Sequence, residues 1–291
     1  MHKSALLFAC SVSLLLGTVT GVQAAEPLTV VVMDPLSAPL SCDCVKGYAQ
    51  RKYEVLGAYL QRELGQPVNV YWSQSLGKAM QEQTAGTADL IIGKHSVVLF
   101  DARAAKLDVA PVAALTGADG KTTQAGLIVV RTDDKAQSVK DLSGYRVFFG
   151  PQDCDEKWSA PRALLTAHGV DIGGLKETFA ACSEAASALV ELDADVAAAA
   201  VISSYAEPLL EGCGAVEKGD LRVLGRTEEL PFVTAFVNRS LPEEQRTHIQ
   251  SALLKVGEDA DLLIALETES GFVPFAAKPE PDSAQPMAKK K

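Results

Sequence analysis

Apolar runs of strand length alternate with helix-length segments along most of this chain, and this alternation limits the folds open to it. The first run, LTVVVMD at 28–34, is apolar up to its final aspartate and is typical of a strand buried on both faces. Residues 49–64 then repeat apolar side chains at helical spacing and stop before Gly65 and Pro67, both of which break helices. The alternation of strands and helices predicts an α/β fold.

The same pattern continues to about residue 268 and divides into two similar blocks. Further strands are predicted at 67–72, 89–93, 109–115, 125–131, 145–150, 177–181, 195–202, 221–225 and 231–238. Helices are predicted at 76–85, after residue 93, and at 138–142, 158–168, 183–192, 204–210 and 242–256, with a further helical piece to about 268. One β-α-β-α-β block begins at Leu28 and the other at Tyr145. Each is predicted to be a doubly wound lobe, and ligands bind such lobes outside the carboxyl ends of the strands.

The two ends of the chain predict export and a disordered tail, and its net charge argues against one class of ligand. Residues 1–24 combine an early lysine, a short apolar run and small residues before Ala24, which predicts a signal peptide for export. The last residues, 276–291, are rich in proline and charge and are predicted to be a disordered tail. A formal net charge of −10 does not favour nucleic-acid binding, which requires a basic face.

Four stretches carry a resemblance to a known family. They are TADLIIGKHSVV (87–98), the segment 126–172 with DLSGYRV and PRALL, SEAASALVELDADVAAAAVISSY (183–205), and LRVLGRTEELPFVTAFVNRSLPEEQR (221–246). In order and spacing, over about 27–257, they resemble the type II periplasmic solute-binding proteins, specifically the phosphonate/phosphate-binding group of ABC importers. The resemblance implies two lobes, 27–119 plus 233–275 and 120–232, joined by two crossing strands and closing on a ligand by a hinge motion.

The resemblance also implies a function. A monomeric, non-enzymatic protein of the periplasm would capture a small solute, a phosphonate- or phosphate-like oxyanion, between its lobes. It would deliver the solute to an ABC permease, or act as a sensor or as an accessory to a periplasmic redox enzyme. No cofactor is implied, although a bound metal is not excluded.

The loops after the predicted strands supply the candidate ligand-binding residues. Strand ends alone indicate which loops face the cleft, and polar side chains gather there. The candidates are Asp34, Tyr48, Lys94, His95, Ser96, Asp153, Asp155, Ser183, Ser203, Ser204 and Tyr205. Anion binders of the resembled family use hydroxyl groups and the free N–H groups of helix N-termini.

The loop PQDCDEKWS, at 151–159, departs from the family's pattern. The resembled proteins have a loop rich in Ser, Thr and Gly at this place, whereas this chain has Asp153, Asp155 and Glu156. Carboxylates repel a phosphonate unless they accept its proton or point away, and Lys94 is the residue expected to offset one of them.

Four cysteines fall in the same predicted loops: Cys42, Cys44, Cys154 and Cys182. Export to an oxidising compartment favours disulfides, for instance between Cys154 and Cys182. The alternative is a thiol-rich site for a metal such as Cu(I) or Zn, or a redox role, but C-x-C spacing is a weak zinc signal. Catalysis by Cys154 with His95 is not favoured, because no third group orients them.

Overall fold

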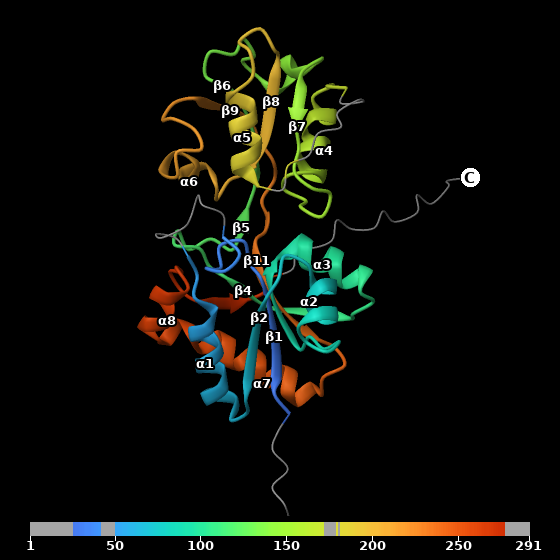
Figure 1. Cartoon of the computed structure of the whole chain (residues 1–291), viewed down its shortest axis with the longest axis vertical. Helices are drawn as coiled ribbons and strands as arrows, with labels where there is room; N and C mark the ends of the chain where they lie inside the picture. The colour runs from blue at the N-terminus through green and yellow to red at the C-terminus, as the bar shows by residue number, and fades with distance from the viewer. Residues whose placement is uncertain (1–25, 42–49, 172–178, 180, 277–291) are drawn as a thin grey trace, which may run out of the picture.

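The computed structural model describes residues 26–41, 50–171, 179 and 181–276. Within this part the chain forms two lobes, drawn one above the other in Figure 1. The predicted signal peptide, Cys42, Cys44 and Tyr48 lie outside the described residues, as do three of the five residues of the strand predicted at 177–181. Among the described residues, no helix is long and apolar enough to cross a membrane.

Lobe 1 is built on a six-stranded sheet with the order β12-β4-β11-β3-β1-β2. Its strands are β1 (Leu28–Met33), β2 (Val68–Trp72), β3 (Leu90–Lys94), β4 (Val109–Leu115), β11 (Val233–Asn238) and β12 (Phe272–Pro274). β1 runs parallel to β2 and β3, as a doubly wound unit requires. β11 returns from the other half of the chain and pairs antiparallel to both β3 and β4.

Helices cover both faces of this sheet because its central strands are apolar on both sides. Val30, Val32 and Leu90 pack into one core with α1 and α7, whereas Val31 and Ile91 pack into the opposite core with α2 and α3. The helical segments of lobe 1 are α1 (Tyr53–Leu64), α2 (Leu76–Glu82), α3 (His95–Ala104), α7 (Glu243–Leu254), η2 (Lys255–Glu258) and α8 (Ala260–Ala265). Lobe 1 is therefore a helix–sheet–helix sandwich.

Lobe 2 repeats this architecture on a four-stranded sheet with the order β7-β8-β6-β9. Its strands are β6 (Gly126–Arg131), β7 (Arg146–Phe148), β8 (Ala198–Ser203) and β9 (Leu221–Arg226). Its helical segments are η1 (Val139–Leu142), α4 (Ser159–Ala167), α5 (Cys182–Val190) and α6 (Glu207–Gly212). Only β7 and β8 are parallel, because β6 enters the sheet antiparallel to both β8 and β9.

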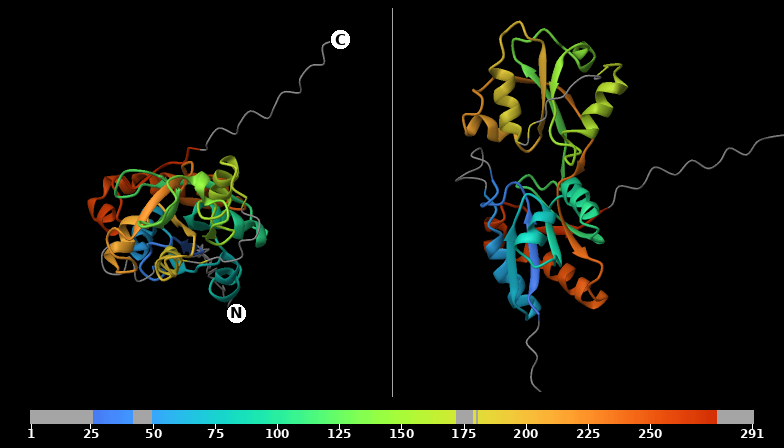
Figure 2. Two further views of the ribbon diagram at one scale, coloured as in Figure 1. Left: turned by 90° about the horizontal axis from the view of Figure 1, so that it is seen from above. Right: turned by 45° about the vertical axis from the view of Figure 1, so that its right-hand side comes forward.

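The two lobes are joined where the chain crosses between the sheets. β5 (Thr123–Gln124) and β10 (Leu230–Pro231) pair antiparallel between the lobes, and each continues directly into a sheet strand, β6 or β11 (Figures 1 and 2). Backbone hydrogen bonds connect the two crossing segments to each other and to lobe 1: Phe232 donates to Thr122, and His95 donates to Phe232. A change in the angle between the lobes must therefore bend these two short segments.

Candidate functional site

A cavity of about 280 Å³ lies between the lobes, at the carboxyl ends of their strands. Lobe 1 contributes an apolar wall and two polar groups: Met33, Leu36, Leu40, Val97, Gln74 and Lys94. Lobe 2 contributes Asp153, Cys154, Lys157, Cys182, Ser183 and Tyr205, with Leu209 and Leu210 from α6. The cavity is thus mostly apolar with a few charged groups, which is the usual composition of a small-molecule site.

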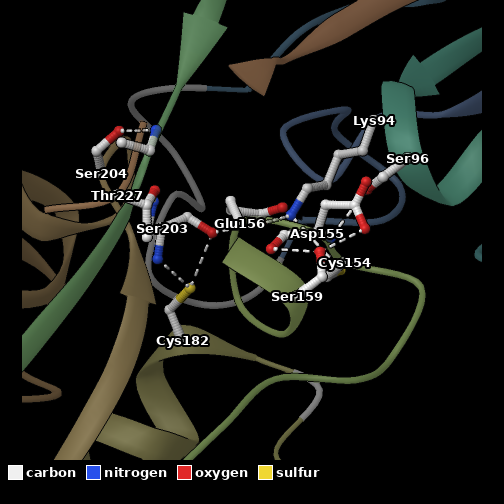
Figure 3. Close-up of polar contacts among 12 residues, drawn as sticks. Lys94, Ser96, Cys154, Asp155, Glu156, Ser159, Cys182, Ser203, Ser204 and Thr227 are labelled. Carbon is white, nitrogen blue, oxygen red and sulfur yellow. Dashed lines mark hydrogen bonds and ion pairs between the residues drawn. The ribbon is translucent and has the colours of Figure 1, made fainter. Parts of the chain in front are cut away.

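The strongest polar contact across this cavity is an ion pair between Lys94 and Glu156. Lys94 is the last residue of β3 in lobe 1, and Glu156 lies in the loop between β7 and α4 in lobe 2 (Figure 3). Their side chains are only 6% and 1% exposed. The same Glu156 oxygen accepts a hydrogen bond of 2.7 Å from the Ser203 hydroxyl at the end of β8. This ion pair is the contact that the sequence predicts for Lys94 with one of the acids of the loop.

The environment keeps both members of the pair charged. Burial alone would raise the pKa of the Glu156 carboxyl, but Lys94, Lys157 and the Ser203 hydrogen bond lower it, and the net pKa lies below the ordinary value. Burial alone would lower the pKa of Lys94, but the carboxylate of Glu156 raises it well above the ordinary value. The cleft therefore contains a buried ion pair at neutral pH.

Backbone geometry fixes the place of Glu156. Gly126 begins β6 beside the crossing, and a Cβ atom there would overlap the carbonyl oxygen of Glu156. Gly150 donates a hydrogen bond of 3.1 Å to the carbonyl of Lys157, which closes the 150–157 loop on itself. The backbone N–H of Asp155, in the same loop, donates a hydrogen bond of 3.2 Å to the Ser96 hydroxyl of lobe 1.

Two thiols flank the ion pair and both are free. Lys94 Nζ lies 3.7 Å from Cys154 Sγ, and the Ser203 N–H donates to Cys182 Sγ at 3.2 Å. The disulfide predicted between Cys154 and Cys182 is not formed; each cysteine is buried and packs against apolar side chains. Burial raises the pKa of Cys154 to about 11, so its thiol is protonated at neutral pH. Within the described ranges, no three His, Cys, Asp or Glu residues are placed to hold a metal ion.

An aromatic stack closes the cavity on the side of the crossing. Tyr205, just after β8, stacks on Phe232 with ring centroids 4.7 Å apart. Lys94 Nζ lies 5.7 Å from the centre of the Tyr205 ring, within the range of a cation–π contact. Tyr205 packs against the cores of both lobes, so it connects the cavity to the hinge.

The predicted candidates divide into those that reach the cavity and those that do not. Lys94, Asp153, Ser183 and Tyr205 line it, whereas Ser203 is fully buried and hydrogen-bonds to Glu156. Asp155 is exposed and accepts a hydrogen bond from Ser159 at 2.9 Å. Ser204 lies on the crossing side, where its hydroxyl accepts from the N–H of Ala125.

His95 and Asp34 have structural partners instead. The His95 ring stacks on Phe275 and shares a hydrogen bond with Thr234, and burial lowers its pKa to about 4, so it is neutral at neutral pH. Asp34 is fully buried and accepts hydrogen bonds from Arg51 at 2.9 Å and from Tyr53 at 2.6 Å. Asp34 thus anchors the start of α1 rather than lining the cavity.

A match to a family model identifies the protein family of this chain. The model described as "ABC transporter, phosphonate, periplasmic substrate-binding protein" matches residues 47–278. The chain belongs to this family. It is a substrate-binding protein with the two-lobed fold expected from the resemblance. Comparison with curated proteins gives no match.

Solved structures agree with the family in fold. This binding protein is similar to XAC2383 from Xanthomonas citri bound to ATP, at 15% identity over 87% of this chain and 92% of that one, with a TM-score of 0.67. It is also similar to a binding-protein component of an ABC phosphonate transporter from Pseudomonas aeruginosa, at 16% identity over 86% and 82%, with a TM-score of 0.64. PhnD1 from Prochlorococcus marinus, in complex with methylphosphonate, matches at 15% identity over 85% and 92%, with a TM-score of 0.60.

Replacing Asp34 by Asn should lower stability without acting directly on the cavity. The substitution removes the charge that compensates the buried Arg51 guanidinium, and breaking a buried pair in this way costs about 3–5 kcal/mol. Chemical denaturation should show a lower midpoint. Asp108→Asn, which disrupts an exposed pair with Arg239, is the control and should leave the midpoint nearly unchanged. An unchanged midpoint in Asp34→Asn would contradict the anchoring role.

The Lys94–Glu156 pair should make stability depend on acid pH. Because the folded state lowers the pKa of Glu156, the pair contributes stability fully above the unfolded pKa of about 4.3, and this contribution is lost as pH falls through the folded value. Thermal melting of the wild type and of a Lys94→Met/Glu156→Gln double variant should be measured across this pH range. The wild type should lose stability relative to the double variant as the pH falls. A difference independent of pH would contradict the assignment.

Proposed function

We propose that this protein captures a small oxyanion of the phosphonate or phosphate type in the cavity between its lobes and presents it to an ABC permease. The observation that carries the proposal is the position of Lys94, which is the last residue of β3 and lines the cavity with its buried side chain. Lobe 2 places a second ammonium group, Lys157, on the same cavity. In a mostly apolar cleft these cations act on an anion more strongly than they would in water, although Asp153 also lines the cavity and Glu156 pairs with Lys94.

Helix α5 adds a further feature that suits an anion. Cys182 and Ser183 form its first turn and line the cavity. The first N–H groups of a helix lack intrahelical partners, and the helix dipole favours negative charge at this end. The methylphosphonate named for the similar structure from Prochlorococcus marinus is of the size and charge that such a site would take.

The location and organisation follow the same proposal. We propose export by residues 1–24 and lobe boundaries at 27–119 plus 233–275 and at 120–232, which agree with the strands of the two sheets. Closure would bend the crossing at β5 and β10, because these two-residue segments join the lobes. A periplasmic redox enzyme as partner and a monomeric state stay predictions from the sequence.

Thermal shift measurements test this function. Methylphosphonate, phosphate or methanesulfonate should raise the melting temperature, because a ligand that binds only the folded state stabilises it by about 2.7 kcal/mol at 100 times its Kd. Choline chloride at the same ionic strength is the control ligand and should give no rise.

The Lys94→Met/Glu156→Gln double variant is the control protein. It removes the anchoring cation together with its ion-pair partner, so it should fold but lose the response to anions. If none of the three anions stabilises the wild type, the proposed ligand class is wrong.

A further inference from the structure

The carboxylate of Glu156 occupies the point where the polar groups of the cleft converge. One of its oxygens contacts Lys94 of lobe 1 and Ser203 of lobe 2 together (Figure 3). A cation and a hydroxyl from opposite lobes form the kind of site that a bridging oxyanion needs, because each donates a hydrogen bond to negative oxygen. In this structure the negative oxygen comes from the protein itself.

This arrangement is built into the fold. The carbonyl of Glu156 packs on the bare Cα of Gly126, and the loop that carries it closes through the Gly150–Lys157 hydrogen bond. The neighbouring Asp155 is exposed, and although its N–H donates to Ser96 of lobe 1, its carboxylate accepts from Ser159 of its own lobe. Of these two acids, only Glu156 reaches Lys94 of lobe 1 in an ion pair.

The contact also holds the lobes together. Lys94 and Glu156 belong to different lobes, and both side chains are removed from solvent. Opening of the cleft would separate them and return two charges to water, whereas closing in the absence of solute restores the pair. A solute anion that takes Lys94 and Ser203 must displace the carboxylate, so its binding free energy is reduced by the cost of breaking the internal pair.

We propose that Glu156 is an internal competitor for the anion position: it pairs with Lys94 across the cleft and with Ser203 of its own lobe, and it weakens the binding of every oxyanion that uses this position. This inference rests on the proposed function. It gives Glu156 control over the affinity for the anion, and so provides a reason for the presence of an acid at this position of the loop.

Isothermal titration of methylphosphonate tests the proposal in three proteins. Glu156→Gln keeps the shape and the hydrogen-bond acceptor but removes the competing charge, and its affinity for methylphosphonate should exceed that of the wild type by about tenfold or more. Asp155→Asn removes the same charge from the adjacent position, away from Lys94, and should stay within about twofold of the wild type. A purely structural role of Glu156 would lower affinity, not raise it.

A second variant decides the question if Glu156→Gln does not fold. Glu156→Asp keeps the charge but shortens the side chain by one methylene, so it should retract the carboxylate from Lys94 and give a smaller gain in affinity. Small-angle scattering of the ligand-free proteins should also show a larger radius of gyration in either Glu156 variant than in the wild type.

The outcomes separate this inference from the function on which it rests. If the wild type binds methylphosphonate and the folded Glu156 variants bind it equally or more weakly, Glu156 is not a competitor, although the proposed function stands. If the wild type and all variants fail to bind methylphosphonate, phosphate and methanesulfonate, the proposed function fails and this inference fails with it.

Discussion

The Lys94–Glu156 ion pair is the interaction on which the arrangement of the two lobes depends. A buried ammonium or carboxylate group is costly to remove from water unless it has a charged partner and further hydrogen bonds. Lys94 finds that partner only in the other lobe, and Ser203 provides the additional hydrogen bond. The strands around the pair bring these groups together: β3 ends at Lys94, β8 ends at Ser203, and β7 leads into the loop that carries Glu156.

Most of the elements could be predicted from the sequence because hydrophobic periodicity is a local signal. The strand at 109–115 has the predicted bounds, β1 and β2 differ by one residue at one end, and β3 is shifted by one residue at both ends. Strand pairing is not local, so the sequence did not indicate that β11 inserts between β3 and β4, or that β6 lies in the middle of the second sheet. β12 was missed because three residues that pair at the edge of a sheet have no periodicity to read.

The candidate site could be predicted as a set of loops, but not as a set of side chains. Lys94, Asp153, Ser183 and Tyr205, chosen by their position after strand ends, line the cavity. This position did not give the direction of each side chain. Asp34 was therefore placed at the cavity by prediction, whereas its carboxylate accepts hydrogen bonds from Arg51 and Tyr53. The apolar lining from α6 was not predicted, because nothing in the sequence distinguishes Leu209 and Leu210 from ordinary core residues. Glu156 was recognised only as one of three acids, since choosing among them requires the geometry of the loop.

The 150–157 loop leads directly into an aromatic cluster, and this has a practical consequence. The chain has two tryptophans, and one of them, Trp158, follows Glu156 by two positions. Its indole ring lies edge-on to Phe149 and beneath the guanidinium of Arg162, 4.7 Å from the ring centre. A displacement of the loop would change the surroundings of this indole, so intrinsic emission can follow the movement of the loop that carries Glu156 without a label.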